Sequence, residues 1–133
     1  MVPFVVGGAE FDSSERAPPP RCHSGTRQDI MGAILAWRNN NSRVERLLWF
    51  DGPAGVGRSA IIQTLAEAVS AGMGKLGTTL FTSRPNERKE SNCVLTTITY
   101  ELAVKDPTYR AYITERMAAD PRILAKSMTE QFK

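Results

Sequence analysis

The sequence predicts an α/β fold in which helices flank a parallel sheet. A continuous apolar run at 47–50 is typical of a strand that is covered on both faces. A glycine-bracketed loop follows, and then apolar residues recur at helical spacing from 61 to 69. A second run at 76–83, rich in Thr and Phe, has the composition of another strand. The chain therefore reads as strand, loop, helix and strand in succession.

The loop between the first strand and its helix reads Gly52-x-x-x-x-Gly57-Arg58-Ser59. Glycines let the backbone come close to a ligand, and N–H groups at a helix start attract an anion. The spacing matches the phosphate-binding P-loop (Walker A) signature except at Arg58, where that signature has Lys. We therefore predict a cofactor site for ATP or GTP with Mg²⁺, in which Ser59 holds the metal. Its residues are Gly52, Pro53, Ala54, Gly55, Val56, Gly57, Arg58 and Ser59.

Arg58 limits what this loop is expected to do. Lysine reaches the β- and γ-phosphates as a compact charge, whereas arginine carries a broad planar fork, so the two are not interchangeable. The backbone cradle survives the exchange, but stabilisation of transition-state charge is more exposed to it. We expect binding rather than turnover and assign no catalytic residue. The alternative interpretation is a glycine-rich turn without a ligand.

Composition narrows the function classes. The chain has 133 residues, 41% of them hydrophobic and 23% charged, which suits one globular domain with a real core. Its net charge of +3 comes from dispersed basic residues, which disfavours a nucleic-acid-binding module. No apolar run approaches membrane-spanning length, so we expect a cytoplasmic protein without membrane contact. One histidine and two distant cysteines, Cys22 and Cys93, suggest neither a zinc site nor a disulfide framework.

The first part of the chain divides at about residue 25. Residues 1–25 contain Gly and Pro clusters with little periodicity and are expected to form an irregular arm or linker. Thr26 and Asp29 resemble a capping box at the start of a helix. One face of that helix is predicted to carry Ile30, Ala33, Ile34 and Trp37, and the polar residues 39–42 end it. Behind the loop, Ile61, Ile62, Leu65, Ala68 and Val69 form the next stripe, with Gly72 as a stop.

The second half is predicted to be mostly helical. Residues 84–92 form a polar loop, and 93–104 is ambiguous because its β-branched residues favour a strand. We predict a helix there, capped by Ser91 or Asn92, because parallel strands need a crossover helix. Asp106-Pro107 and Asp120-Pro121 each offer an N-cap followed by proline at the first helical position. The apolar faces of these last two helices carry Tyr109, Tyr112, Ile113 and Met117, and then Leu124, Met128 and Phe132.

Several segments in order carry a family resemblance: CHSGTRQDIMGAILAW, LLWFDGPAGVGRSAIIQTLAE, LGTTLFTSR, LTTITYELAVKDPTYRAYI and DPRILAKSMTEQF. Together they resemble the NACHT-type P-loop NTPase domain. More narrowly, they resemble the nephrocystin-3-like N-terminal domain that is abundant in large fungal signal-transduction ATPases. The resemblance covers about residues 11–133, and residues 26–133 are predicted to be the N-terminal portion of such a domain. It implies binding of ATP or GTP with Mg²⁺ and an oligomerisation switch.

The resemblance also implies that part of the domain is missing. A Walker B strand, which ends in an acidic residue, is expected in the sequence beyond Lys133. In the sheet order of the family it would lie between the two predicted strands, so the sheet formed by these residues alone would be incomplete. The first hypothesis is a fragment that holds nucleotide phosphates, with Arg27 near the base and Arg84 facing phosphate or solvated in its loop. The alternative is a truncated or decayed, non-catalytic interaction module without significant nucleotide binding. In a larger chain, self-association or other protein partners are expected.

Overall fold

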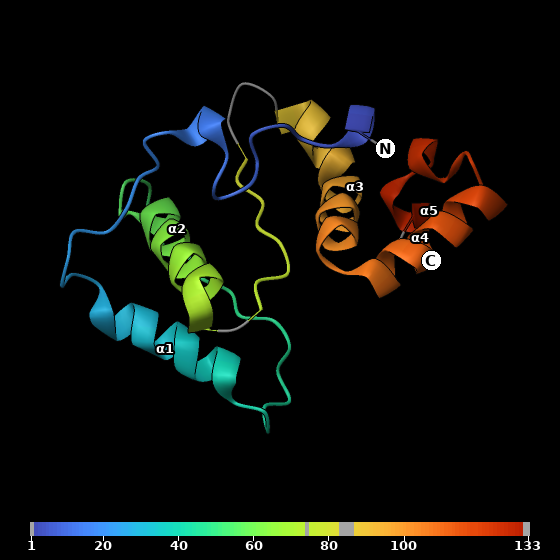
Figure 1. Ribbon diagram of the computed structural model, residues 1–133. Helices are drawn as coiled ribbons and strands as arrows, with labels where there is room; N and C mark the ends of the chain where they lie inside the picture. The colour runs from blue at the N-terminus through green and yellow to red at the C-terminus, as the bar shows by residue number, and fades with distance from the viewer. Residues whose placement is uncertain (1, 74, 83–86, 132–133) are drawn as a thin grey trace. The chain divides into compact units, whose positions relative to one another are not determined.

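The computed structural model describes residues 2–73, 75–82 and 87–131 (Figure 1). The chain forms two compact units. One unit contains residues 18–75, and the other combines residues 1–17 with residues 76–133.

The unit of residues 18–75 is built around two helices, α1 (Gln28–Asn39) and α2 (Arg58–Ala68). The predicted stripe is confirmed at its two ends, Ile61 and Val69, which are buried, whereas Ile62, Leu65 and Ala68 are half-buried. After Ala68 the chain continues into a π-type turn, η3 (Val69–Met73), in which Gly72 has a φ of 145° and breaks the helix. The predicted stop at this glycine is confirmed.

The ends of α1 are fixed differently from the prediction. The capping box is wrong, because Arg27 is the N-cap in a left-handed conformation and no side chain caps the helix. Thr26 instead donates its hydroxyl to the His23 carbonyl, at 2.7 Å. The predicted end is confirmed, and the guanidinium of Arg43 donates to the carbonyls there, Trp37, Arg38 and Asn40. A cation at the C-terminus of a helix also complements its dipole.

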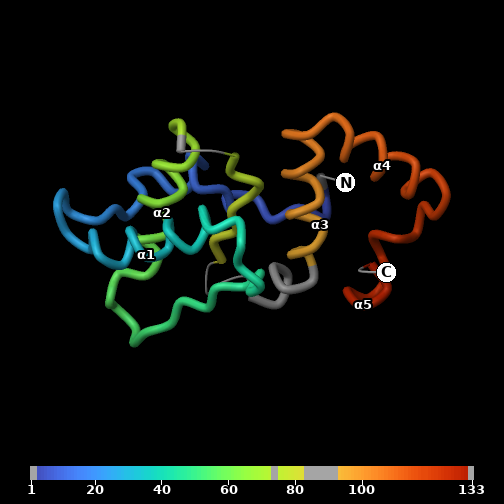
Figure 2. Tube along the Cα trace, turned by 90° about the horizontal axis from the view of Figure 1, so that it is seen from below, coloured from blue at the N-terminus to red at the C-terminus, as the bar shows by residue number. Residues whose placement is uncertain are grey.

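The other unit is dominated by α3 (Glu87–Lys105) and α4 (Pro107–Ala119), which pack against each other. Figure 2 follows the chain from α4 to α5 (Met128–Gln131), through the short 3₁₀ turn η5 (Ile123–Ala125). Two more 3₁₀ turns, η1 (Val2–Phe4) and η2 (Ser14–Arg16), belong to the N-terminal segment. None of the helices in the described residues is long and apolar enough to cross a bilayer.

The helix predicted at 93–104 is confirmed, although it begins earlier than expected. Residues 87–92 are already helical, so the predicted polar loop and the Ser91 or Asn92 cap are wrong there. Thr96 and Thr97 fit a helix because both hydroxyls donate to the Cys93 carbonyl, at 2.9 and 2.7 Å. Both side chains are buried. Tertiary contacts therefore override the β-propensity of this run.

These threonines also hold the N-terminal segment. The Thr97 hydroxyl accepts a hydrogen bond from the Val6 N–H at 3.0 Å, and the single Thr96 hydroxyl proton is shared between the Cys93 and Phe4 carbonyls. Farther along, the Phe81 N–H donates to the carbonyl of the fully buried Ala9, at 2.8 Å. Residues 4–11 thus form part of this unit, although their backbone is irregular.

The two Asp-Pro starts have different outcomes. Asp106 caps α4 as predicted, because its carboxylate accepts from the Thr108 N–H at 2.8 Å and the Tyr109 N–H at 3.2 Å. Asp120 accepts from the Arg122 N–H at 3.2 Å, but only η5 and the four-residue α5 follow it. The prediction of one helix starting at Pro121 is therefore wrong for the described residues. Tyr112 of the α4 stripe is 57% exposed, so its predicted place on the buried face is also wrong.

The predicted α/β fold with a P-loop NTPase-like parallel sheet is wrong for the described residues. Their regular elements are all helices and helical turns, and no strand or sheet forms among them. At 47–50 the chain has no regular structure and is solvated, with Leu47 80% and Trp49 81% exposed. The segment 75–82 has no regular structure either. Its Phe81 N–H donates to the Ala9 carbonyl, and the Phe11 N–H donates to the Thr79 hydroxyl at 3.0 Å. An extended segment becomes a strand only when a neighbour completes its backbone ladder, and none does here.

Candidate functional site: the loop before α2

The loop of residues 52–57 turns directly into the N-terminus of α2. Gly57 is the N-cap, with φ 84° and ψ 25°, and its carbonyl accepts the first helical bond from the Ile61 N–H at 3.0 Å. In the part of the chain that the structure describes, no side chain caps this end of the helix. The N–H groups of the first turn are therefore left without a side-chain acceptor, and the positive end of the helix dipole is open. Such an end can accept an anion.

Two glycines are required by backbone conformation rather than by space. Gly55 and Gly57 both have a φ of 84°, in the left-handed region, yet an added Cβ would meet no atom within 4 Å at either position. At Gly52 the reverse holds, because a Cβ would lie 3.1 Å from Cγ2 of Val56. The loop therefore depends on glycine for a tight contact at its start and for two left-handed residues at its end.

Arg58 does not extend freely from the loop. Its Nη1 donates to Oδ1 of Asp51 at 3.1 Å, so the predicted phosphate partner is paired with a carboxylate at the other end of the loop. Both side chains are well exposed, at 43% and 67%. The pair is therefore weak, on the order of 0–1 kcal/mol, and can exchange for a stronger anion.

The remaining predicted residues are distributed around this loop. Ser59 lies exposed on the first turn of α2. Arg27, predicted near the base, lies beside the loop, and its Nη2 donates to the Val56 carbonyl at 3.1 Å. Arg84 lies outside the described residues. Within the described part of the chain, no cluster of three or more His, Cys, Asp or Glu side chains could hold a metal ion.

Comparison with known proteins identifies the family. The family described as nephrocystin 3, N-terminal, matches residues 25–133, which is most of the chain. The chain belongs to this family. No curated protein and no solved structure matches it. The nephrocystin-3-like part of the predicted resemblance is thereby confirmed.

The family match includes the whole loop and α2, together with Arg27. It begins at residue 25, whereas the compact unit that holds the loop begins at residue 18. Residues 21 and 22, just before the match, contact α2. The Cys22 N–H donates to the Thr64 hydroxyl at 3.1 Å, and Arg21 forms an ion pair with Glu67 at 2.8 Å.

In this nephrocystin 3 N-terminal chain, α2 also makes polar contacts that were not predicted from the sequence. Gln63 is fully buried, and its Nε2 donates to Oε1 of Glu67 at 2.8 Å. The Arg21 guanidinium, together with the Gln63 amide, holds the pKa of Glu67 below its usual range. The spacing of Gln63 and Glu67, four residues apart on a helix, is the one signal in the sequence that could have indicated this network.

Proposed function

We propose that the loop of residues 52–59 binds the phosphates of a nucleoside triphosphate, ATP or GTP, together with Mg²⁺. The observation that carries the proposal is the open N-terminus of α2, preceded by two left-handed glycines and without a side-chain cap. The sequence Gly52-x-x-x-x-Gly57-Arg58-Ser59 and membership in the nephrocystin 3 N-terminal family support it. Signal transduction as part of a larger NACHT-type chain belongs to the same proposal.

Each residue has a defined part in this binding. Backbone N–H groups of the loop and of the first turn of α2 would hold phosphate oxygens. Ser59 would place its hydroxyl toward the Mg²⁺, whose remaining ligands would be phosphate oxygens and water. Arg58 would leave Asp51 to reach a phosphate. No acidic residue in the described part of the chain is assigned to activate water, so hydrolysis is not proposed.

The test is a titration of Mg·ATP and Mg·GTP into the chain, followed by calorimetry, with Gly57→Ala as the loop variant. Gly25→Ala is the matched control, since Gly25 also has a positive φ, of 78°, and open space around it. Both changes add similar backbone strain, on the order of 1 kcal/mol, but only Gly57 belongs to the loop. We expect saturable binding that Gly57→Ala weakens at least about tenfold and Gly25→Ala leaves unchanged. No saturable binding by a chain shown to be folded would refute the proposal.

A second candidate function, a non-catalytic interaction module, is favoured by one observation. Val44, Leu47 and Trp49 lie in the segment before the loop and are exposed by 87%, 80% and 81%. Several large, exposed apolar side chains within one short segment are typical of a surface that other chains contact. Replacing Trp49 with Lys should then reduce self-association in sedimentation experiments, whereas the same change at the exposed Tyr112 should not. Equal behaviour of both variants would argue against this candidate.

A further inference from the structure

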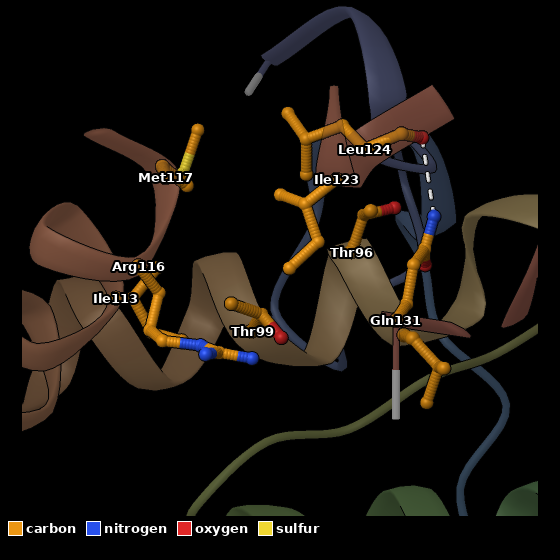
Figure 3. Close-up of a pocket in the computed structure, with 9 residues that line it drawn as sticks. Thr96, Thr99, Ile113, Arg116, Met117, Ile123, Leu124 and Gln131 are labelled. Atoms are coloured by element: carbon orange, nitrogen blue, oxygen red, sulfur yellow. Dashed lines mark hydrogen bonds between the residues drawn. The ribbon is translucent and has the colours of Figure 1, made fainter. Parts of the chain in front are cut away.

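A small cavity lies within the unit that contains α3, α4 and α5. Its volume is about 70 Å³. Figure 3 shows the side chains of α3 on one side and those of α4, η5 and α5 around it. The walls consist of Leu95, Thr96, Thr99, Ile113, Arg116, Met117, Ile123, Leu124 and Gln131.

The size and lining of the cavity select a small aliphatic group. Five of its residues are apolar: Leu95, Ile113, Met117, Ile123 and Leu124. The volume is less than half of the ~150 Å³ that holds benzene in an engineered apolar cavity, so an aromatic ring does not fit. A single branched side chain such as that of Leu, Ile or Val suits this space.

Gln131 places an unused acceptor at the cavity. Its Nε2 donates to the Leu124 carbonyl at 3.1 Å and to the Lys126 carbonyl at 3.0 Å. Only the NH₂ group can donate to two carbonyls, so the orientation of the amide is settled and Oε1 faces the other way. This Oε1 is buried, and no hydrogen-bond donor in the described residues reaches it. A buried acceptor of this kind requires a donor from a ligand or from water.

Arg116 supplies a positive charge at the same cavity. In Figure 3 its guanidinium extends toward Thr99, and Gln131 enters from the opposite side. Among the described residues, no Asp or Glu lines the cavity. The pKa of Asp120 is lowered mainly by its bond to Lys126 and less by Arg116, so this nearby carboxylate is already engaged. The guanidinium therefore remains available to an anionic ligand.

We propose that this cavity binds the C-terminus of a polypeptide whose last residue is Leu, Ile or Val. The aliphatic side chain enters the apolar cavity, and the backbone N–H of the last residue donates to Oε1 of Gln131. The terminal carboxylate pairs with Arg116. These three contacts use each feature of the cavity, and recognition of a chain terminus by a carboxylate partner is an established binding mode. The proposal does not depend on nucleotide binding at the loop before α2.

The test uses the peptide acetyl-Gly-Ser-Gly-Leu with a free carboxylate, and the same peptide as its C-terminal amide. Binding is followed by NMR chemical shifts of the ¹⁵N-labelled chain. We expect saturable shifts at residues of the cavity with the acid, and affinity at least about fivefold lower with the amide. Arg116→Gln should weaken binding of the acid to a similar extent. Arg122→Gln is the matched control, because Arg122 is exposed in the same unit but does not line the cavity.

A second variant tests the cavity itself. Thr99→Leu adds apolar volume inside the walls and should abolish binding, with circular dichroism to confirm that the helices persist. Three outcomes would overturn the proposal: no binding of the acid at millimolar concentration, equal affinity for acid and amide, or unchanged binding by a folded Thr99→Leu variant.

Discussion

Arg58 and Asp51 form an ion pair across the two ends of the loop before α2, with Nη1 3.1 Å from Oδ1. Arg58 stands where the Walker A signature has lysine, and it is paired with the residue that directly precedes the loop. The carboxylate also places a negative charge beside a helix terminus that is suited to anions. Asp51 would oppose the proposed phosphate binding in two ways: it engages the guanidinium of Arg58, and its negative charge repels a phosphate.

The first prediction is that Asp51→Asn strengthens the binding of Mg·nucleotide. An exposed pair of this kind is worth on the order of 0–1 kcal/mol, so the affinity should rise about two- to fivefold. The effect should diminish in high salt, because exposed charges are screened. Calorimetric titration at low and high salt measures both.

Glu45→Gln serves as the control for Asp51→Asn. Glu45 is exposed in the same unit and makes no ion pair with any described residue. An equal gain from both variants would mean that net charge, rather than release of Arg58, controls affinity.

The sequence predicted helices better than strands, for a physical reason. A helix satisfies its backbone within one segment, so periodicity and caps such as Asp106 were sufficient to place it. The apolar run at 47–50 needs hydrogen bonds from other segments to become a strand. Within the described residues no segment supplies them, and Leu47 and Trp49 remain solvated.

The candidate site was predicted in its backbone but not in its side-chain contacts. Gly57 marks a left-handed N-cap because glycine tolerates that conformation, and this follows from residue type alone. The Arg58–Asp51 pair and the Arg27 contact to Val56 depend on how the loop folds back. Contacts between residues far apart in the sequence leave no periodic signal, so the acceptor of Arg27, 29 positions away, could not be predicted.

A second prediction concerns the acid stability of the unit of residues 18–75. The Arg21 hydrogen bond, with that of Gln63, lowers the pKa of Glu67. A carboxyl group with a lowered folded-state pKa contributes stability above its unfolded pKa, and this contribution is lost as the pH falls through the folded value. Glu67→Gln should therefore reduce the free energy of unfolding at about pH 7 but much less at about pH 3. Urea unfolding at both pH values measures the difference.

Glu45→Gln is again a suitable comparison for Glu67→Gln, because Glu45 forms no ion pair within residues 2–73, 75–82 and 87–131. A loss of stability from Glu67→Gln that is the same at both pH values would contradict the electrostatic origin of its effect. It would point instead to the packing of Gln63.

A third prediction has the opposite sign. Burial raises the pKa of Glu101 on α3, as do its hydrogen bond with Glu10 and the charges of Glu10 and Asp12, while Lys105 opposes them. A carboxyl group with a raised folded-state pKa contributes most stability below its unfolded pKa and loses it as the pH rises through the folded value. Glu101→Gln should thus raise the free energy of unfolding at neutral pH, by about 0.5 kcal/mol after solvent screening.

The gain from Glu101→Gln should vanish below about pH 4, where the unfolded glutamate is also protonated. Glu115→Gln, on the exposed face of α4, should change stability little at any pH. Denaturant unfolding across this range separates the two. A destabilising effect of Glu101→Gln at neutral pH would show that the ionised carboxylate is favourable in the folded chain.

The last prediction contrasts a cap that forms with one that does not. Asp106 accepts two backbone N–H groups at the start of α4, at 2.8 and 3.2 Å, whereas no side chain caps α1 although Asp29 lies in its first turn. Asp106→Ala leaves two N–H groups without their acceptor and should cost about 1 kcal/mol. Asp29→Ala removes only a favourable charge near the helix start, worth about 0.3 kcal/mol. The urea midpoint should therefore fall clearly for Asp106→Ala and barely for Asp29→Ala, at unchanged m-values. Equal losses would mean that α4 is stabilised by negative charge near its N-terminus and not by the geometry of the cap.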